Sequence, residues 1–427
     1  MNKYLSSILV LVILFNSVYI KTYAFAGQDV AVGEYIQLGK YNDQPILWRV
    51  INKQDVNNDG VEELMLFSDK ILSLKPFDAL GDNVDYDLDG VEDTYTVHRS
   101  DWGSNYWDRS SIKEWLNSPE TSVSYTQAQV PDRDHVKNYT SAEGGQDEVI
   151  GENAYSTEKG FLAEGNFTSD ERNIIKPVTH RTLIAEVDNN YTGKTVTGNS
   201  YLPDAVGDTP DMWAANFDDY YGINVQDKVF FLSIWELNEY VYSASTGLTH
   251  PISGDNYFLA YPTPQAVDKS EYPIGISDYH AYWLGTPFTQ FDNSSVYAVY
   301  PDNGTLTNTH FEAPGAWRGY YGIRPAMFIS SDVVLSGTGT NIDPYKITSY
   351  GVPQYPVGVT SNDRKYFRYF LGLDNNNNAR VMLVAPANED STVKQIFNRN
   401  DILDPVTHKY KQGIYYIIDN KGIINVY

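Results

Sequence analysis

The sequence predicts a mixed fold of short β-strands and a few short helices, with a small β-rich domain at the C-terminal end. Short segments of alternating apolar and polar residues, bounded by Gly, Pro, Asn and Asp, are typical of strands. In three places a Ser or Thr lies three residues before a Glu, a pattern that begins a helix. Long stretches rich in Asn, Asp, Gly, Ser and Thr, notably residues 118–160 and 188–227, indicate binding loops or insertions.

The composition bounds the size of the core and excludes several classes of partner. The chain has 427 residues, of which 42% are hydrophobic and 14% aromatic, enough for an extensive core and two domains. A formal net charge of -24 predicts repulsion from nucleic-acid phosphates and from anionic membranes. Because there is no Cys, disulfides and thiolate-bound zinc are excluded. The 35 Tyr residues favour surfaces that bind sugars or proteins.

The first 26 residues have the features of a secretory signal peptide. Lys3 precedes an apolar segment, and Ala24-Phe25-Ala26 supplies a small-residue cleavage site. The uninterrupted apolar run, residues 8–15, is far shorter than the roughly 20 residues of a membrane span. We therefore expect a secreted, extracellular protein that begins at Gly27 and has no membrane span. Secretion without cysteine suits a Gram-positive bacterium.

The elements are predicted in the following order. Residues 34–51 predict a hairpin and residues 63–68 a third strand. Helices are predicted to begin at Ser111, Thr168 and Ser233, because each hydroxyl can cap a free N–H while the Glu three residues later reaches back. Further strands are predicted at residues 281–284, 295–300, 305–311 and 323–329. Beyond these, strands are predicted at residues 364–373 and 379–386, a helix at 392–397 and a closing hairpin at 413–427.

This pattern predicts four segments along the chain. They are a signal peptide at 1–26, an α+β domain at 27–348, a linker at 349–357 and a β-rich domain at 358–427. About 70 residues is a marginal size for an independent domain.

Several segments, in this order, resemble one protein family. They include GEYIQLGKYNDQPILWRVI, SNYWDRSSIKEWLN, YWLGTPF, YGIRPAMFI and GTGTNIDPYKI. Over residues 33–347 the chain resembles the secreted proteins of domain-of-unknown-function family 6273. Gly285 stands where those relatives usually have Arg, so the function of that Arg is not carried over.

The segment from Trp317 to Ala326 also resembles the closing G-F-R-x-A motif of C-type-lectin-like and formylglycine-generating-enzyme-like domains. That resemblance implies an α+β fold with a C-type-lectin-like core of small twisted β-sheets, a few short helices and long loops. The formylglycine-generating enzymes use cysteines, so their activity is not implied here. Arg324, between Gly322 and Pro325, is interpreted as a structural salt-bridge residue.

Two aspartate-rich loops predict calcium sites. Oxygen ligands at positions one, three and five, a Gly at six, a carbonyl at seven and a later acid can surround a hard cation. Both loops lack the bidentate Glu at position twelve of an EF-hand, and the alternative interpretation is a polar turn between strands. The expected ligands of the more convincing loop are Asp85, Asp87, Asp89, Val91 and Asp93, and those of the other are Asp55, Asn57, Asp59, Val61 and Glu63.

Catalytic motifs are absent from the sequence. The seven His residues show no zinc-binding spacing, and Ser110-Ser111-Ile112-Lys113 lacks the partner motifs of acyl-transfer enzymes. No catalytic residue is therefore predicted, and we expect a non-catalytic protein. The alternative is a secreted polysaccharide hydrolase with an unrecognised carboxylate pair.

Aromatic residues in polar loops are the candidate ligand contacts. Rings flanked by Gly and Asp have few local core neighbours, and exposed aromatic patches are typical of binding sites. The candidates are Trp213, Tyr220, Tyr221, Trp317 and Tyr320. The sequence thus favours a secreted binding or surface-interaction protein, stabilised by calcium, whose partner is an extracellular glycan or protein.

Overall fold

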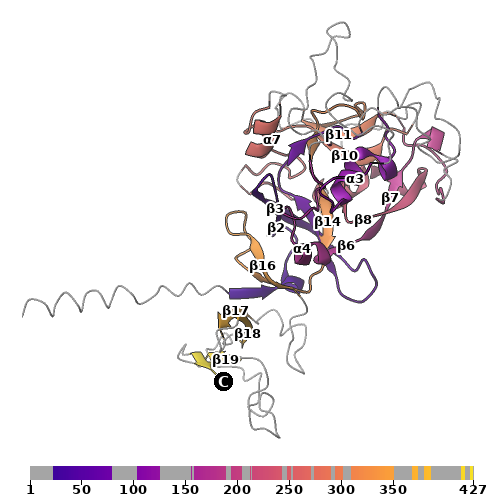
Figure 1. Cartoon of the computed structure of the whole chain (residues 1–427). Coiled ribbons are helices and arrows are strands. Elements are labelled where there is room, and N and C mark those ends of the chain that lie inside the picture. Colours follow the sequence, from indigo (N-terminus) through magenta and orange to yellow (C-terminus); the bar gives the residue numbers. More distant parts are fainter. Residues whose placement is uncertain are drawn as a thin grey trace, which may run out of the picture. The chain divides into compact units, whose positions relative to one another are not determined.

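The structure, a computed structural model, describes two compact units (Figure 1). Described are residues 23–78, 103–125, 155, 158–188, 194–203, 212, 214–242, 248–251, 253–270, 274–289, 294–301, 309–350, 368–373, 379–385, 415–418 and 424–426. The core unit comprises residues 30–331 and 339–346, and the terminal unit comprises residues 1–29, 332–338 and 347–427. The apolar run at 8–15 and the expected helix at 392–397 lie outside the described residues. The expected domain boundaries stay a prediction.

The first sheet of the core unit has the strand order β16, β2, β3, β4, β14 and β6, with β9 also paired to β14, and only residues 345–346 of β16 belong to this unit. The bounds are β2 Tyr35–Tyr41, β3 Gln44–Gln54, β4 Glu63–Ser68, β6 Ile175–Lys176, β9 Val229–Phe230, β14 Ala326–Ile329 and β16 Tyr345–Tyr350. The expected hairpin and the expected third strand are confirmed. Every residue of β4 is buried, because this strand has a partner on each side and packed residues on both faces.

A second sheet of the core unit has the order β12, β11, β10, β13 and β5. The bounds are β5 Ser73–Leu74, β10 Tyr282–Pro287, β11 Val296–Pro301, β12 Thr309–Glu312 and β13 Gly322–Ile323. Strands β7 (Val178–Leu183) and β8 (Gly222–Asp227) form a separate antiparallel pair. The mixed α+β class is therefore confirmed.

Short helices join these strands, and their starts follow the predicted chemistry with one exception. Their bounds are η2 Trp107–Arg109, α3 Ser111–Asn117, α4 Ser169–Ile174, η6 Glu186–Asp188, η7 Phe217–Asp219, α6 Ile234–Leu237, η8 Asn238–Tyr242 and α7 Pro264–Lys269. Thr168 and Ser233 form complete capping boxes, as predicted. The cap of α3 is Ser110 instead of Ser111, because the Ser111 N–H and hydroxyl both donate to the buried carboxylate of Asp78.

Arg324 is buried and interrupts the expected strand at 323–329. Its guanidinium donates to the carbonyl oxygens of Ser68, Phe258 and Tyr257 at 2.9, 3.0 and 3.0 Å. It also lies 4.0 Å from the centroid of the Phe67 ring. The prediction that Arg324 forms a salt bridge was wrong: within the described residues, its guanidinium contacts backbone carbonyls and aromatic ring faces. Pro325, which has no N–H, ends the pairing of β13, and β14 begins after it.

The terminal unit contains η1 (Gly27–Asp29) and strands in the order β20, β19, β18, β17, β1 and β15. The bounds are β1 Tyr23–Ala26, β15 Val333–Ser336, β17 Arg368–Leu373, β18 Ala379–Ala385, β19 Tyr415–Ile418 and β20 Ile424–Val426. Strand β1 contains the expected cleavage site, so cleavage after Ala26 would remove this strand from between β15 and β17. No helix among the described residues has the length and apolar character needed to cross a membrane.

Candidate functional site

A large cavity, 640 Å³ in volume, lies in the core unit beside strand β7 and helix α6; we call it the Trp235 cavity. Its lining includes the rings of His180, Phe217, Phe230, Trp235 and Tyr240. The side chain of Trp235 is 37% exposed, whereas most large aromatic side chains of the core unit are buried. The cavity thus combines accessible aromatic rings with a hollow large enough for a small ligand.

A π-helical turn, η8, places two of these rings together. Helix α6 carries Trp235, and η8 follows it directly and carries Tyr240. In a π-helical turn the backbone hydrogen bonds join residues five apart, so side chains at that spacing come close together. The ring centroids of Trp235 and Tyr240 are 5.7 Å apart at an interplanar angle of 79°. Burial and the neighbouring carboxylate of Glu236 raise the pKa of Tyr240 to about 12, so its hydroxyl stays protonated.

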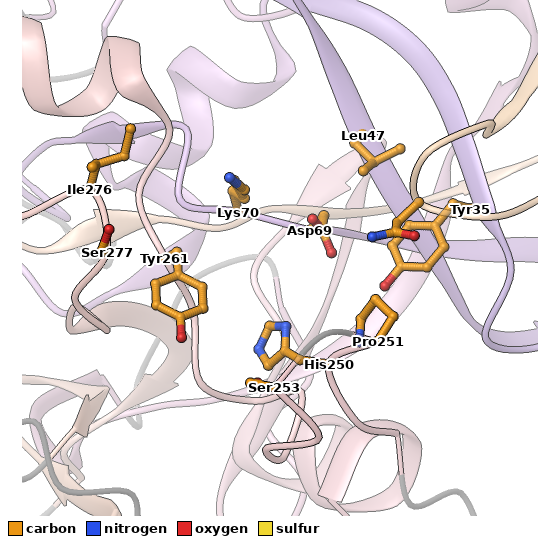
Figure 2. A pocket seen from close by; sticks show the side chains of 11 residues that line it. Tyr35, Leu47, Asp69, Lys70, His250, Pro251, Ser253, Tyr261, Ile276 and Ser277 are labelled. Atoms are coloured by element: carbon orange, nitrogen blue, oxygen red, sulfur yellow. The ribbon is translucent and has the colours of Figure 1, made fainter.

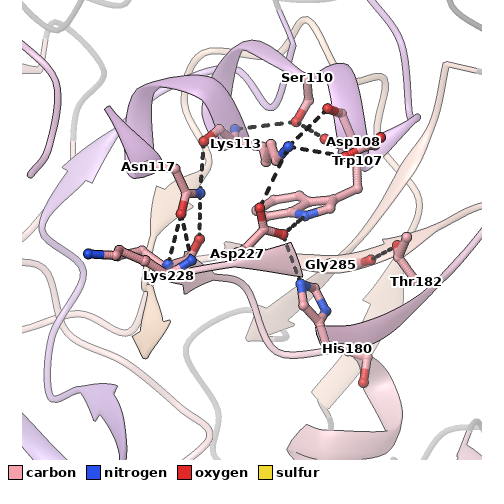
Figure 3. Close-up of polar contacts among 12 residues, drawn as sticks. Trp107, Asp108, Ser110, Lys113, Asn117, His180, Thr182, Asp227, Lys228 and Gly285 are labelled. Atoms are coloured by element: carbon pink, nitrogen blue, oxygen red, sulfur yellow. Dashed lines mark hydrogen bonds and ion pairs between the residues drawn. The ribbon is translucent and has the colours of Figure 1, made fainter. Parts of the chain in front are cut away.

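Asp227 fixes the orientation of His180 (Figure 3). This buried carboxylate, at the end of β8, accepts a hydrogen bond from Trp107 Nε1 at 2.8 Å, and its Oδ2 lies 2.9 Å from His180 Nε2. In the neutral imidazole this contact places the proton on Nε2 and leaves Nδ1 as the acceptor. The imidazole also stacks on Phe230 with 4.8 Å between ring centroids. Strand β7 therefore presents a rigidly held His180 to the cavity.

Two cations balance the negative charge behind His180. Lys113 Nζ lies 3.1 Å from Asp108 Oδ1 and 3.6 Å from Asp227 Oδ1. Burial by itself would lower the pKa of Lys113, but the carboxylates of Asp227 and Asp108 outweigh it and raise that pKa. Lys194 also pairs with Asp108, at 3.3 Å. The network thus contains two lysines and two aspartates, and it anchors α3 to β8.

Gly285, which replaces the Arg usual in the resembled proteins, lies beside this network (Figure 3). Its N–H donates to Leu232 O at 2.9 Å, and its carbonyl accepts from Thr182 Oγ1 at 3.3 Å. A Cβ at this position would lie 2.7 Å from Phe231 O, closer than side-chain carbons approach backbone oxygen in proteins. An Arg would therefore require the local backbone to shift.

The Asp55–Glu63 segment, one of the two predicted calcium loops, forms part of the cavity wall. Asp55, Val56, Asn57 and Asn58 line the cavity. The amide nitrogen of Asn57 donates to Asp59 Oδ2 at 3.0 Å and to Glu63 Oε1 at 3.1 Å. The same Asn57 side chain accepts from Asp59 N through Oδ1 at 2.9 Å. The structure therefore brings the side chains of Asn57, Asp59 and Glu63 together, while the other predicted loop, Asp85 to Asp93, lies outside the described residues.

The predicted aromatic ligand residues have several different surroundings. Trp213 lies outside the described residues. Tyr220 is 7% exposed, and its hydroxyl donates to Ala215 O at 3.3 Å, whereas Tyr221 is half-buried with its ring 4.8 Å from that of Tyr201. Phe217 and Asp218, from the same loop, line the Trp235 cavity.

Trp317 does not present an exposed ring, which corrects that expectation. Its side chain is 0% exposed, and the guanidinium of Arg318 lies 5.3 Å from its ring centroid. The neighbouring Tyr320 is half-buried and lines a smaller cavity of 280 Å³ with Arg318 and Pro314. Flanking glycines indicated a loop correctly, but packing by residues distant in sequence buries the indole.

Sequence reasoning missed His180, Trp235 and Tyr240. Trp235 appeared only as part of a helix start, and His180 has no metal-binding spacing. The one local indication was that Trp235 and Tyr240 are five residues apart. This spacing brings two side chains together only in a π-helical turn, which the sequence did not predict. Proximity to the Asp55 loop arises from packing between segments more than 100 residues apart.

The comparisons with known proteins found one match. A family model described as Domain of unknown function (DUF6273) matches residues 62–331, more than half of the chain. No curated protein and no solved structure matches.

The different burial of the Trp317 and Trp235 side chains predicts that truncation will lower stability by very different amounts. Trp317→Ala should lower the free energy of unfolding by about 3–5 kcal/mol, because it removes a fully buried ring. Trp235→Ala should change it by about 1 kcal/mol or less, because that ring is partly in water. Urea unfolding followed by circular dichroism measures both, and equal losses in the two variants would contradict these positions.

Proposed function

We propose that this chain, which belongs to the DUF6273 family, is a secreted, non-catalytic carbohydrate-binding protein whose ligand site is the Trp235 cavity and whose binding loops are ordered by calcium. The observation that carries the proposal is the partly exposed Trp235 ring, paired with Tyr240 in a cavity that also contains polar planar side chains. Protein ligands are the other class of partner that the composition favours.

The lining of the cavity matches the chemistry of a sugar. A pyranose has an apolar C–H face and a rim of hydroxyl groups, so it requires a flat aromatic surface beside hydrogen-bonding groups. Trp235 and Tyr240 supply rings, and Gln54 and Gln226 supply amides that both donate and accept. His180, whose Nε2 lies 2.9 Å from Asp227 Oδ2, adds a polar ring to the lining. This mixture suits a neutral polyol better than a wholly apolar ligand.

Calcium is the proposed cofactor of the loop that borders this cavity. In the present arrangement the Asn57 amide nitrogen lies between the acids Asp59 and Glu63, which is a position a cation could take. Rotation of the amide would then turn Oδ1, a suitable calcium ligand, towards the ion. Asp55 also lies in this loop, where its carboxylate accepts from the N–H groups of Asp59 and Gly60. For residues 85–93 the proposal rests on the sequence alone.

Two further parts of the proposal concern architecture and compartment. A C-type-lectin-like arrangement is supported by the short helices and the long connecting segments between the strands of the core unit. Secretion is supported by the basic start, the short apolar run and the Ala24-Phe25-Ala26 site.

The alternative function, polysaccharide hydrolysis, has one observation in its favour. Asp218 and Glu236 both line the Trp235 cavity and could supply a carboxylate pair. However, Glu236 Oε2 already accepts hydrogen bonds from the N–H and the hydroxyl of Ser233 in the capping box. Its role at the start of α6 therefore accounts for this carboxylate without catalysis.

The first prediction concerns sugar binding. On a glycan array, the mature protein should bind a subset of polysaccharides, and Trp235→Ala should weaken that binding by about tenfold or more, as expected for a central aromatic contact. Tyr350→Ala is the matched control, because Tyr350 is 39% exposed but lies in the terminal unit. Unchanged binding by Trp235→Ala would remove the cavity from the proposal, and release of reducing sugar from a bound glycan would favour the hydrolase.

The second prediction concerns calcium. Millimolar calcium should raise the melting temperature, because a ligand that binds only the native state stabilises it by about 2.7 kcal/mol at a hundredfold excess over its dissociation constant. Extracellular sites of this kind bind at about 10⁻⁴–10⁻³ M. Asp55→Asn with Asp59→Asn should lose one part of the increase and Asp87→Ala with Asp89→Ala another, while magnesium should have less effect. An unchanged wild-type melting temperature, with no heat on calorimetric titration, would leave both loops as polar turns.

The third prediction concerns the N-terminus. Protein recovered from the culture medium should begin at Gly27, because a signal peptidase recognises small residues at the positions of Ala24 and Ala26. N-terminal sequencing decides this, and protein that stays in the membrane fraction with Met1 intact would show that the segment is an anchor.

A further inference from the structure

The charged residues that line the Trp235 cavity are mostly acidic. Three acids, Asp55, Asp218 and Glu236, line it together with one permanent cation, Arg181. The network behind His180 contains two lysines and two aspartates, so it leaves this balance unchanged. The lining therefore carries an excess of negative charge beside its aromatic rings, and that excess bears on which sugar the cavity accepts.

The carboxylate of Asp218 is available to a ligand. Asp218 is exposed in the short helical turn η7, next to Phe217, whose ring lines the same cavity. Within the described residues its side chain has neither a hydrogen bond nor an ion pair. A ligand cation can therefore pair with Asp218 without breaking a contact inside the protein.

Glu236 offers one of its two carboxylate oxygens. The N–H and the hydroxyl of Ser233 both donate to Glu236 Oε2, at 2.8 and 2.9 Å, and they hold this half-buried carboxylate in place. Oε1 accepts no hydrogen bond from the described part of the chain. Burial, with the negative charges of Glu236 and Glu239 in second place, raises the pKa of Tyr240 to about 12. The charge of Glu236 is thus felt at the aromatic wall of the cavity.

The guanidinium of Arg181 is occupied by other groups of the protein. Its Nη1 donates to Thr197 Oγ1 at 2.8 Å, and its Nη2 donates to Thr197 O at 2.9 Å and to Tyr220 O. It forms no ion pair with a carboxylate among the described residues. Its charge offsets one of the three acids, so the lining still favours a cation.

The rings of the cavity are compatible with a positively charged ligand. Trp235 and Tyr240 lie at 79° to each other with 5.7 Å between their centroids, so they form two walls of a corner. The face of an aromatic ring attracts a cation, and the indole does so most strongly. The same rings that suit the C–H face of a sugar therefore also suit an ammonium group attached to it.

A second cavity, of 540 Å³, has no such excess of acids (Figure 2). Its charged lining residues are Asp69 and Lys70, one of each sign. His250 also lines it, and burial lowers the pKa of this imidazole, which keeps it uncharged at neutral pH. The charges of this second cavity cancel, whereas those of the Trp235 cavity do not.

Building on the proposed function, which places a sugar in the Trp235 cavity, we propose that this sugar is an amino sugar with a free, protonated amine. Asp218 and Glu236 pair with the ammonium group, and the corner formed by Trp235 and Tyr240 packs against the ring that carries it. The two acids that a hydrolase would use as a catalytic pair have instead a role in recognition. The ligand class is a glycan that contains glucosamine units without N-acetyl groups.

The test compares sugars that differ in one substituent. Chitotriose is a trimer of glucosamine, cellotriose has a hydroxyl in place of each amine, and triacetylchitotriose has a neutral amide there. Isothermal titration of the mature chain, with calcium present and under mildly acidic conditions that protonate the amines, should give chitotriose at least a tenfold higher affinity than either neutral trimer. Added salt should weaken the binding of chitotriose and leave that of cellotriose unchanged.

Variants locate the charge that is responsible. Glu236→Gln should weaken chitotriose binding by about tenfold while Gln preserves the cap of α6, and Asp218→Asn should weaken it by about threefold, as expected for an exposed ion pair. Neither variant should alter the affinity for cellotriose. Asp219→Asn is the matched control, because this adjacent exposed residue removes the same charge from the chain but does not line the cavity.

Four outcomes would overturn the proposal. They are equal affinities for chitotriose and cellotriose, no binding of chitotriose, chitotriose binding that Trp235→Ala or Glu236→Gln leaves unchanged, and equal affinity for trilysine, which would show that charge alone is recognised and that a peptide fits as well. Binding of neutral glycans that depends on Trp235 would leave the proposed function standing without the amine, whereas a protein that binds no glycan on the array would contradict both.

Discussion

The guanidinium of Arg324 joins the two sheets of the core unit, and the packing of the core around it depends on that junction. It lies between β13 of the second sheet and β14 of the first. Its donors reach Ser68 at the end of β4 and two carbonyls in the segment at 257–258. A buried charge is costly unless its donors are satisfied, so these three carbonyls are held in fixed positions relative to one another. The segment that carries His250 and Tyr257 is thereby held against the first sheet.

Aromatic packing extends this junction through the core unit. The Arg324 guanidinium contacts the faces of Phe67, Tyr257 and Tyr282, and Trp283 donates through Nε1 to Lys75 O at 2.8 Å. Most of the large rings are therefore part of the core, as their buried surface indicates. Trp235, which stays 37% exposed in the core unit, is notable because an exposed ring does not contribute to the packed core.

Buried charges of the core unit are satisfied in two different ways. Behind the Trp235 cavity, Asp227 is surrounded by Trp107, His180 and Lys113, so a charged network holds one imidazole in place. Around Tyr35, by contrast, the guanidiniums of Arg49 and Arg324 donate to backbone carbonyl groups. The first arrangement fixes a side chain that lines a cavity, and the second fixes the backbone of the core.

The sequence by itself determined the local structure that short-range chemistry controls. Alternating residues defined the first hairpin, a short apolar run defined β4, and the Ser/Thr-x-x-Glu pattern located the starts of α4 and α6. The order of the motifs along the chain was enough to identify the family. The cap of α3 shifted by one residue because Asp78, more than 30 residues away, binds Ser111.

Only the tertiary structure decided which aromatic residues are accessible. Trp317 lies in a glycine-flanked loop and Trp235 at a predicted helix start, yet the first is fully buried and the second is not. Burial depends on side chains contributed by distant segments, and pattern and composition do not record those contacts. For the same reason the sequence could propose an aromatic ligand site but could not place it: the Asp55 loop, His180 and Trp235 become neighbours only when three separate parts of the chain pack together.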